Sequence, residues 1–337
     1  MAAAKVAVFG AGSIGCYVGG AWAAAGLDVS LIGRERLAKA VAGHGLTIGD
    51  YTGWRHVFAP GEIVFATDPG ALADADIILV TVKGGSTAEA GEVIARHGRE
   101  GATVISFQNG VGNKSLLESA LDERFAVVQG MVPYNVIHLG DGRFHKGVAG
   151  TLFAEDVPAM RALAEQVASS REPLRLSPEM AGIAWGKLLI NLNNAVNALS
   201  GRTLLEQLGE RGYRRVVAAS QREALRLLRR ARIVPAKVGP LAPRLVPLAI
   251  GSPDWLFKQL FARRWKIDDK ARSSMSDDLL SGRVTEVGQL NGEVVRLAES
   301  LGLDAPINRR IVALVRKAES GAPPLEPETL QREVFGR

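Results

Sequence analysis

The beginning of this chain constrains its fold more than any other stretch. An apolar run at residues 6–9 leads directly into the sequence GAGSIG. A buried parallel strand that turns into a helix needs glycines for the tight turn, for close approach of the backbone to a diphosphate, and for packing of the helix on the strand. The anion would lie at the N-terminus of the helix, where free N–H groups and the helix dipole attract negative charge. We therefore predict a cofactor loop that consists of Gly10, Gly12, Ser13, Ile14 and Gly15.

The residues after this loop support a βαβ unit. A helix of small residues is predicted over 13–25, and a second apolar run at 29–32 follows where the next parallel strand would lie. A glycine-rich turn with no ligand is the alternative interpretation. The pattern favours a doubly wound, Rossmann-like α/β domain, which we place at residues 1–177.

The segment after the second strand bears on the choice of dinucleotide. In such folds an acidic residue at the end of this strand binds the ribose hydroxyls, whereas an arginine accommodates a 2′-phosphate. Gly33 occupies the position of the acid and Arg34 follows it, which favours NADP. Glu35 keeps NAD open, and Arg34 as the start of a solvated helix is the alternative.

Two later apolar runs predict buried parallel strands that end at the same edge of the sheet. One spans 76–83 and ends at Lys83, and the other spans 102–106 and leads to Asn109. Ligands of doubly wound sheets bind at this carboxyl edge, so both side chains are candidate ligand contacts. For Asn109, which precedes a glycine, a purely local turn is equally open.

Three further strands are predicted to complete the sheet. They span 126–129, 131–138 and 143–153, and Asp141-Gly142 is predicted to form a hairpin turn between the last two.

Residues 178–337 show no further strand pattern and predict an all-helical domain. Its first helix, predicted over 179–199 with Pro178 at its start, carries Lys187, Asn191 and Asn194 at spacings i, i+4 and i+7, which places them on one face. Buried without partners, these groups would destabilise the domain, so the face is turned either to water or to a ligand. Further on, Thr285 is predicted to begin a helix that holds Glu286 in its first turn.

Charge and composition restrict the partners. The chain has 337 residues and a net charge of +6, a mild excess that fits an anionic small ligand. The arginines within 211–232 alternate with apolar residues at helical spacing, which favours a solvated helix face over a polyanion-binding surface. No aromatic residues accompany them for base stacking, so we expect no nucleic-acid partner.

Other classes are disfavoured by single features. Six glycines lie in the uncharged stretch 6–27, so we expect no membrane span there. Scattered histidines give no metal-ligand spacing, and no metal site is expected. The single cysteine, Cys16, and the absence of a charged leader before the first strand lead us to expect a cytoplasmic protein.

Six motifs, taken together in their order and spacing, resemble the ketopantoate reductase (2-dehydropantoate 2-reductase) family. They are GAGSIG at 10–15, VTVK at 80–83, QNGVG at 108–112, KLLIN at 187–191, RSSM at 272–275 and TEVGQLNG at 285–292. The resemblance runs from Val6 to about Lys317. It implies a hydride transfer from NADPH to the 2-oxo carbon of ketopantoate, which yields D-pantoate for pantothenate synthesis.

The resemblance also implies roles for individual residues. Lys187 would be the general acid that protonates the carbonyl oxygen, and Glu286 would position the lysine and the ligand. Asn109, Asn191 and Ser274 match substrate-binding positions, and we add Asn194 from the same helix face. Lys83 matches a lysine at the junction of cofactor and substrate, and Arg34 matches the residue that recognises the 2′-phosphate.

Two positions depart from the family pattern and leave the substrate open. Ala195 and Ala271 stand where many members carry asparagine. A reductase of a different branched or hydroxylated 2-oxo acid is therefore the first alternative, and a regulatory protein that binds NADP without turnover is the second. The presence of both Lys187 and Glu286 favours an enzyme, because binding alone requires no proton donor. A homodimer is compatible with the sequence.

Overall fold

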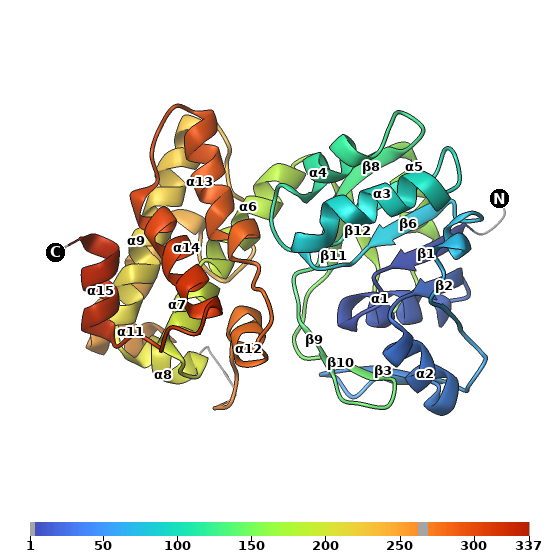
Figure 1. Ribbon diagram of the computed structural model, residues 1–337, viewed down its shortest axis with the longest axis horizontal. Helices are drawn as coiled ribbons and strands as arrows, with labels where there is room; N and C mark the ends of the chain where they lie inside the picture. The colour runs from blue at the N-terminus through green and yellow to red at the C-terminus, as the bar shows by residue number, and fades with distance from the viewer. Residues whose placement is uncertain (1–3, 262–268, 337) are drawn as a thin grey trace. The chain divides into compact units, whose positions relative to one another are not determined.

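The chain folds into two compact units, Met1–Met180 and Ala181–Arg337. The structure is a computed structural model that describes residues 4–261 and 269–336 (Figure 1). The first unit is built from sheets and helices, and the described part of the second is helical. The predicted fold class, a Rossmann-like sheet domain followed by a helical domain, is confirmed.

The main sheet of the first unit has the strand order β12-β11-β8-β7-β6-β1-β2-β5. Every neighbouring pair in it is parallel except β8 with β11. The chain moves outward from β1 through β2 to β5, and then returns to β6 on the other side of β1. The order therefore reverses between β1 and β6, the place where doubly wound sheets bind ligands. The strands are β1 (Lys5–Phe9), β2 (Asp28–Ile32), β5 (Val64–Ala66), β6 (Ile77–Val80), β7 (Thr103–Ser106), β8 (Ala126–Met131), β11 (Leu152–Glu155) and β12 (Leu174–Ser177).

A second, four-stranded sheet corrects one prediction. It has the order β4-β3-β10-β9, with β3 (Leu46–Asp50), β4 (Arg55–Phe58), β9 (Val136–His138) and β10 (Arg143–Lys146). The assignment of 131–138 and 143–153 to the main sheet is therefore wrong for β9 and β10. The second run is two strands, because residues 147–151 leave one sheet at Lys146 and enter the other at Leu152. The hairpin at Asp141-Gly142 is confirmed, since β9 and β10 pair antiparallel and both turn residues have positive φ.

Helix α1 (Ser13–Ala23) lies between the two sheets, with β1 and β2 on one side and β3, β9 and β10 on the other (Figure 1). Its residues from Gly15 to Trp22 are all buried. The absence of charge in this helix has its reason here, because a helix covered on both sides needs apolar or small residues all round. The other helices of this unit are α2 (Glu35–His44), α3 (Thr87–His97), α4 (Asn113–Ala120) and α5 (Pro158–Gln166), with short 3-10 turns η1 (Pro69–Leu72) and η2 (Gly84–Ser86).

In the second unit the predicted helix over 179–199 is interrupted. It consists of α6 (Met180–Asn191) and α7 (Asn193–Ser200), which Leu192 separates. Helix α9 (Arg211–Arg230) packs against α7 and against α14 (Pro306–Glu319) and α15 (Pro327–Phe335). The remaining elements are α8 (Leu204–Gly209), η3 (Pro243–Leu245), α10 (Val246–Ile250), α11 (Asp254–Phe261), α12 (Ser274–Leu280), η4 (Val287–Gln289) and α13 (Asn291–Ser300). Among the described helices, none combines the length and apolarity that crossing a membrane requires.

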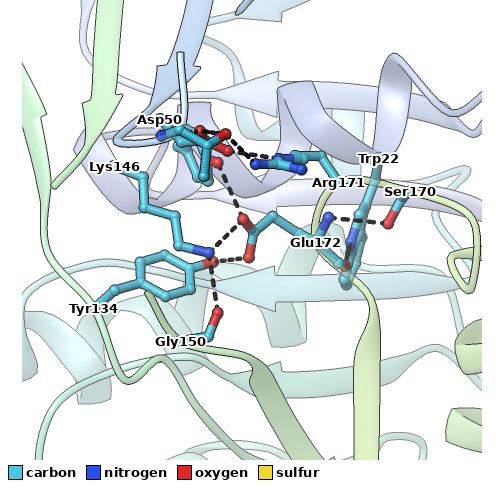
Figure 2. A network of polar contacts seen from close by, with 10 residues as sticks. Trp22, Asp50, Tyr134, Lys146, Gly150, Ser170, Arg171 and Glu172 are labelled. Atoms are coloured by element: carbon cyan, nitrogen blue, oxygen red, sulfur yellow. Dashed lines mark hydrogen bonds and ion pairs between the residues drawn. The ribbon is translucent and has the colours of Figure 1, made fainter. Parts of the chain in front are cut away.

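A buried ion pair joins the second sheet to the main sheet (Figure 2). Lys146 Nζ on β10 lies 2.6 Å from Glu172 Oε1, and Glu172 is only 1% exposed. The hydroxyls of Tyr134 and Tyr17 donate to the same carboxylate at 2.7 and 3.0 Å, and Lys146 also donates to Gly150 O at 3.0 Å. This pair is compensated by hydrogen bonds on both partners, as a buried charge requires.

A second pair lies beside it. Arg171 donates to Asp50 Oδ2 on β3 at 2.5 Å (Figure 2). Burial would raise the pKa of Asp50, but hydrogen bonds from Arg171 and Thr52 lower it to about 2. Both pairs tie the segment before β12 to the second sheet.

Replacement of Lys146 should therefore destabilise the protein strongly. Lys146→Met leaves the Glu172 carboxylate buried without its counterion, and we expect the free energy of unfolding to fall by about 3–5 kcal/mol. Lys39→Met is the matched control, because Lys39 and Glu35 form an exposed pair whose loss should cost less than about 0.5 kcal/mol. Urea denaturation followed by circular dichroism measures both. Equal losses in the two variants would show that the Lys146–Glu172 pair does not hold the sheets together.

Candidate active site

The turn after β1 fits closely against the loop that follows β6, the strand on the other side of the reversal point. Gly10 has φ +92°, a conformation that favours glycine. A Cβ atom there would lie 2.6 Å from Val82 N and 2.5 Å from Val82 Cγ1. Gly10 N and Ala11 N both donate to Ile32 O, at 3.0 and 2.8 Å, so the turn is fastened to β2 as well.

The reasons for glycine differ between positions 15 and 12. A Cβ on Gly15 would lie 2.6 Å from Thr81 Oγ1 and 2.8 Å from Val8 Cγ1, so α1 can approach β1 only with glycine there. A Cβ on Gly12 would have Gly10 O at 3.7 Å as its nearest neighbour outside the adjoining residues, which is ordinary contact. The packing of the protein therefore does not require glycine at 12, whereas close approach of a diphosphate does.

The N-terminus of α1 has the properties of an anion-binding site. Gly12 is the N-cap, no side chain caps the helix, and the first turn holds no acidic residue. The N–H groups of Ser13 and Ile14 lie in the first turn, where a helix offers no acceptor of its own. These donors and the helix dipole suit a diphosphate, so the predicted cofactor loop fits a dinucleotide.

Arg34 lies at the end of β2, where a ribose would be recognised. It is exposed and forms the N-cap of α2, directly after Gly33, whose N–H donates to Ala66 O at 3.0 Å. The competing acid, Glu35, pairs with Lys39 Nζ at 2.7 Å one helical turn on. Of the two charged residues beside the strand end, Arg34 is therefore the one that forms no ion pair with a described residue of α2.

Lys83 and Asn109 both follow strands at the carboxyl edge of the sheet. The strand that was predicted to end at Lys83 ends at Val80, so Lys83 stands in the following loop as the N-cap of η2. Asn109 follows β7, and its carbonyl accepts from Asn113 Nδ2 at 2.7 Å. Gly110 has φ +99°, so the local turn exists, and the partly buried Asn109 side chain sits on it.

A buried polar network that the sequence did not reveal holds these two loops together. Gln108 Nε2 donates to Val82 O at 3.1 Å and to Thr87 Oγ1 at 2.7 Å. Thr87 Oγ1 lies 2.9 Å from Asn113 Oδ1 and donates to Gly84 O at the same distance. Gln108 and Asn113 stand in and beside the QNGVG motif, which was the available signal. Their role in the structure is to fix the loops that carry Lys83 and Asn109.

In the second unit, the partly buried Lys187 lies on α6, a helix whose buried residues include the apolar Trp185 and Leu188. Desolvation by the surrounding protein lowers the pKa of Lys187 to about 8, and the charge of Glu286 opposes this shift. A lysine with its pKa near neutrality can release a proton at physiological pH.

Glu286 is brought near Lys187, although not on the element that was predicted. It is the N-cap of the 3-10 turn η4, and the α-helix α13 begins only at Asn291. Thr285 is anchored by Glu319, whose Oε1 accepts from both its N–H and its hydroxyl at 2.7 Å. This anchor fixes the backbone that presents Glu286.

The RSSM segment is fastened to α7 by two residues that sequence reasoning missed. Ser273 N donates to the fully buried Asn197 Oδ1 at 2.9 Å, and Ser273 Oγ donates to Asn194 O at 3.2 Å. Ser273 is also the N-cap of α12 and accepts from Ser276 N. Ser274, the predicted substrate contact, is thereby exposed at the start of α12.

The predicted polar face of the first helix is only partly buried. Lys187, Asn191 and Asn194 are all intermediate in exposure, whereas Ala195 is fully buried in the apolar core. Asn194 lines a largely apolar cavity of about 280 Å³ whose walls include Leu189 and Val238. Although Leu192 interrupts the helix, the Asn194 side chain is still partly accessible.

Two further features concern the possible metal ligands and the single cysteine. Within residues 4–261 and 269–336 no group of three or more His, Cys, Asp or Glu side chains is arranged to hold a metal ion. Cys16 is buried in α1, and burial raises the pKa of its thiol well above the ordinary value.

Comparisons with known proteins agree over nearly the whole chain. Family models described as "Ketopantoate reductase PanE/ApbA" and "Ketopantoate reductase PanE/ApbA C terminal" match residues 6–158 and 179–319. The 2-dehydropantoate 2-reductase of Halobacterium salinarum is 30% identical over 329 residues, which cover 94% of this chain and 99% of that protein. A solved PanE/ApbA family ketopantoate reductase from Ralstonia eutropha JMP134 has a TM-score of 0.79 and 29% identity, covering 94% of this chain and 98% of that one. A D-mandelate dehydrogenase solved with NADH and anilino(oxo)acetate has a TM-score of 0.77 over 94% of this chain and 98% of that one, but at 19% identity it shows the fold alone.

The different roles of the glycines can be separated by substitution. Gly12→Ala adds a methyl group where the protein has room, so we expect unchanged stability but at least about tenfold weaker binding of NADPH. Gly10→Ala forces alanine into positive φ against Val82, and we expect it to lower the free energy of unfolding by more than about 2 kcal/mol. Fluorescence titration and urea denaturation measure the two effects. If Gly12→Ala binds NADPH as tightly as the unaltered protein, the loop does not hold the diphosphate.

Proposed function

Because the chain belongs to the ketopantoate reductase family, we propose that it is an NADPH-dependent 2-oxo acid reductase that converts 2-dehydropantoate to D-pantoate. The observation that carries the proposal is Lys187, a partly buried lysine on an apolar helix. Burial lowers the pKa of this lysine to about 8, and the nearby charge of Glu286 acts in the opposite direction. A proton donor held in this way serves turnover rather than binding. The pathway, pantothenate biosynthesis, and the cytoplasmic, homodimeric state are part of the same proposal.

The first unit would hold the cofactor. The N–H groups of Ser13 and Ile14 would bind the diphosphate, and Arg34 would bind the 2′-phosphate. NADPH, when bound, supplies the hydride that reduces the 2-oxo carbon. Lys83 and Asn109, which follow β6 and β7, would contact the cofactor and the substrate at the carboxyl edge of the sheet.

The second unit would supply the proton. As the carbonyl carbon is reduced, negative charge develops on its oxygen, and the Lys187 ammonium both offsets this charge and donates the proton. Glu286 would keep the ammonium protonated and oriented, since its charge raises the pKa of Lys187 against the effect of burial. Asn191, Asn194 and Ser274 would hold the substrate by hydrogen bonds, and all three are at least partly accessible.

The identity of the 2-oxo acid is the finer part of the proposal. Ala195 is fully buried and has no amide to offer a substrate, where the resemblance to the family leads us to expect asparagine. The family match nevertheless makes 2-dehydropantoate the first substrate to test. A panel that includes other branched and hydroxylated 2-oxo acids would rank the alternatives by kcat/KM.

Removal of Lys187 tests the proposal directly. We expect the purified protein to oxidise NADPH when 2-dehydropantoate is added, and Lys187→Ala to lose at least about 99% of kcat because the transition state loses its proton donor. The Kd for NADPH, measured by fluorescence, should stay within about twofold. Undiminished turnover in this variant would remove the general-acid role, and a failure of the unaltered protein with every 2-oxo acid of the panel would remove the reductase function.

The pH dependence provides an independent readout of the same residue. A general acid acts in its protonated form, so kcat/KM for reduction should be level below the pKa of about 8 and fall as pH rises through it. Glu286→Gln removes the charge that raises this pKa, so the fall should move to lower pH. A midpoint that stays in place in Glu286→Gln would contradict the coupling of the two residues.

Arg34 tests the choice of dinucleotide. Arg34→Ala should raise KM for NADPH by about tenfold or more and leave KM for NADH nearly unchanged, because only NADPH carries the 2′-phosphate. Arg36→Ala is the matched control, since Arg36 is also exposed but lies within α2 rather than at the strand end. An unchanged preference in Arg34→Ala would mean that this arginine is merely solvated.

A further inference from the structure

The second unit contains a cavity that the proposed reductase function does not use. It has a volume of about 620 Å³ and lies among α9, α14 and α15. This volume falls within the range of roughly 300–1,000 Å³ that is usual for small-molecule sites. None of the residues assigned to the cofactor, the substrate or the proton transfer lines it.

Three arginines dominate the cavity wall. Arg215 and Arg222 come from α9, seven residues apart and therefore on one side of the helix, and Arg332 comes from α15. All three are exposed, and none forms an ion pair with a described carboxylate within 4.0 Å. The cavity also holds one carboxylate, Glu328, so three cations and one anion leave a local charge of about +2.

Arg214, which directly precedes Arg215 on α9, is by contrast an arginine that stabilises the fold. Arg214 is fully buried, donates to the carbonyls of Leu208, Gly209, Ile250 and Ser252, and pairs with Asp254 at 2.6 Å. By contrast, Arg222 makes one hydrogen bond, from Nε to Ala218 O at 3.1 Å. Most N–H groups of the cavity arginines are therefore not engaged in holding the fold.

The remaining lining fixes the chemistry of a ligand. Ile307 and Phe335, both partly buried, add apolar side chains to the lining of the cavity. Guanidinium groups match the paired oxygens of a phosphate, and three arginines that line one cavity favour a multiply charged anion. We propose that this cavity binds a small organic phosphate, with its phosphate groups on Arg215, Arg222 and Arg332 and its apolar part against Ile307 and Phe335.

The proposal does not depend on the reductase activity and can be tested by binding alone. Calorimetry with inorganic pyrophosphate should show binding that weakens as NaCl is raised, and this binding should persist in Gly12→Ala, in which the dinucleotide loop is impaired. Phenyl phosphate should bind more tightly than inorganic phosphate, because only the former can contact the apolar side chains.

Matched variants on one helix locate the site. Arg215→Gln and Arg222→Gln should each weaken pyrophosphate binding about tenfold. Arg229→Gln and Arg230→Gln remove the same charge from α9 outside the cavity and should change it less than about twofold. Equal weakening in all four variants would mean a general basic surface, such as a polyanion would use, and would overturn the cavity site. The absence of pyrophosphate binding would overturn the proposed phosphate site. Equal affinities for phenyl phosphate and inorganic phosphate would overturn the proposed apolar contact.

Discussion

The contact between the Gly10 turn and Val82 is the constraint on which the first unit depends. It lies where the strand order reverses between β1 and β6, and a Cβ atom on Gly10 would lie 2.6 Å from the Val82 backbone nitrogen. Because the turn is this tight, α1 starts only four residues after β1 ends, and no side chain caps its first N–H groups. Strands β2, β6 and β7 are parallel to β1 or to one another and end at the same edge of the sheet, so the loops that carry Arg34, Lys83 and Asn109 start at that edge.

In the second unit the main feature is the environment of Lys187. It keeps a lysine partly dehydrated on an apolar helix without burying it unpaired, and the nearby Glu286 charge limits the resulting fall in the pKa of Lys187. Hydrogen bonds anchor the surrounding segments: Asn197 and Ser273 fasten α12 to α7, and Glu319 holds Thr285 beside Glu286. Geometry and electrostatics in this unit therefore support a proton donor, while the first unit supports a dinucleotide.

Local features of both units could be predicted from the sequence, and nonlocal ones could not. The glycine loop, the parallel strands and the spacing of Lys187 and Asn191 follow from patterns a few residues long, and the fold class derived from them is confirmed. The second sheet was missed because nothing within 136–146 states that its partner is β3, almost a hundred residues earlier in the chain. For the same reason Lys146 and Glu172, or Asn197 and Ser273, could not be paired from sequence. Residue roles at the site remain predictions, since the placement of a side chain does not establish its chemistry.

The most direct measurement follows the transferred hydrogen. With NADPH deuterated on the transferred face and 2-dehydropantoate in ordinary water, mass spectrometry and NMR of the product should find one deuterium on C2. That result would show that the hydride from the bound dinucleotide is transferred to the 2-oxo carbon. Hydrogen from water on C2, or oxidation of the dinucleotide with no labelled hydroxy acid formed, would contradict the account.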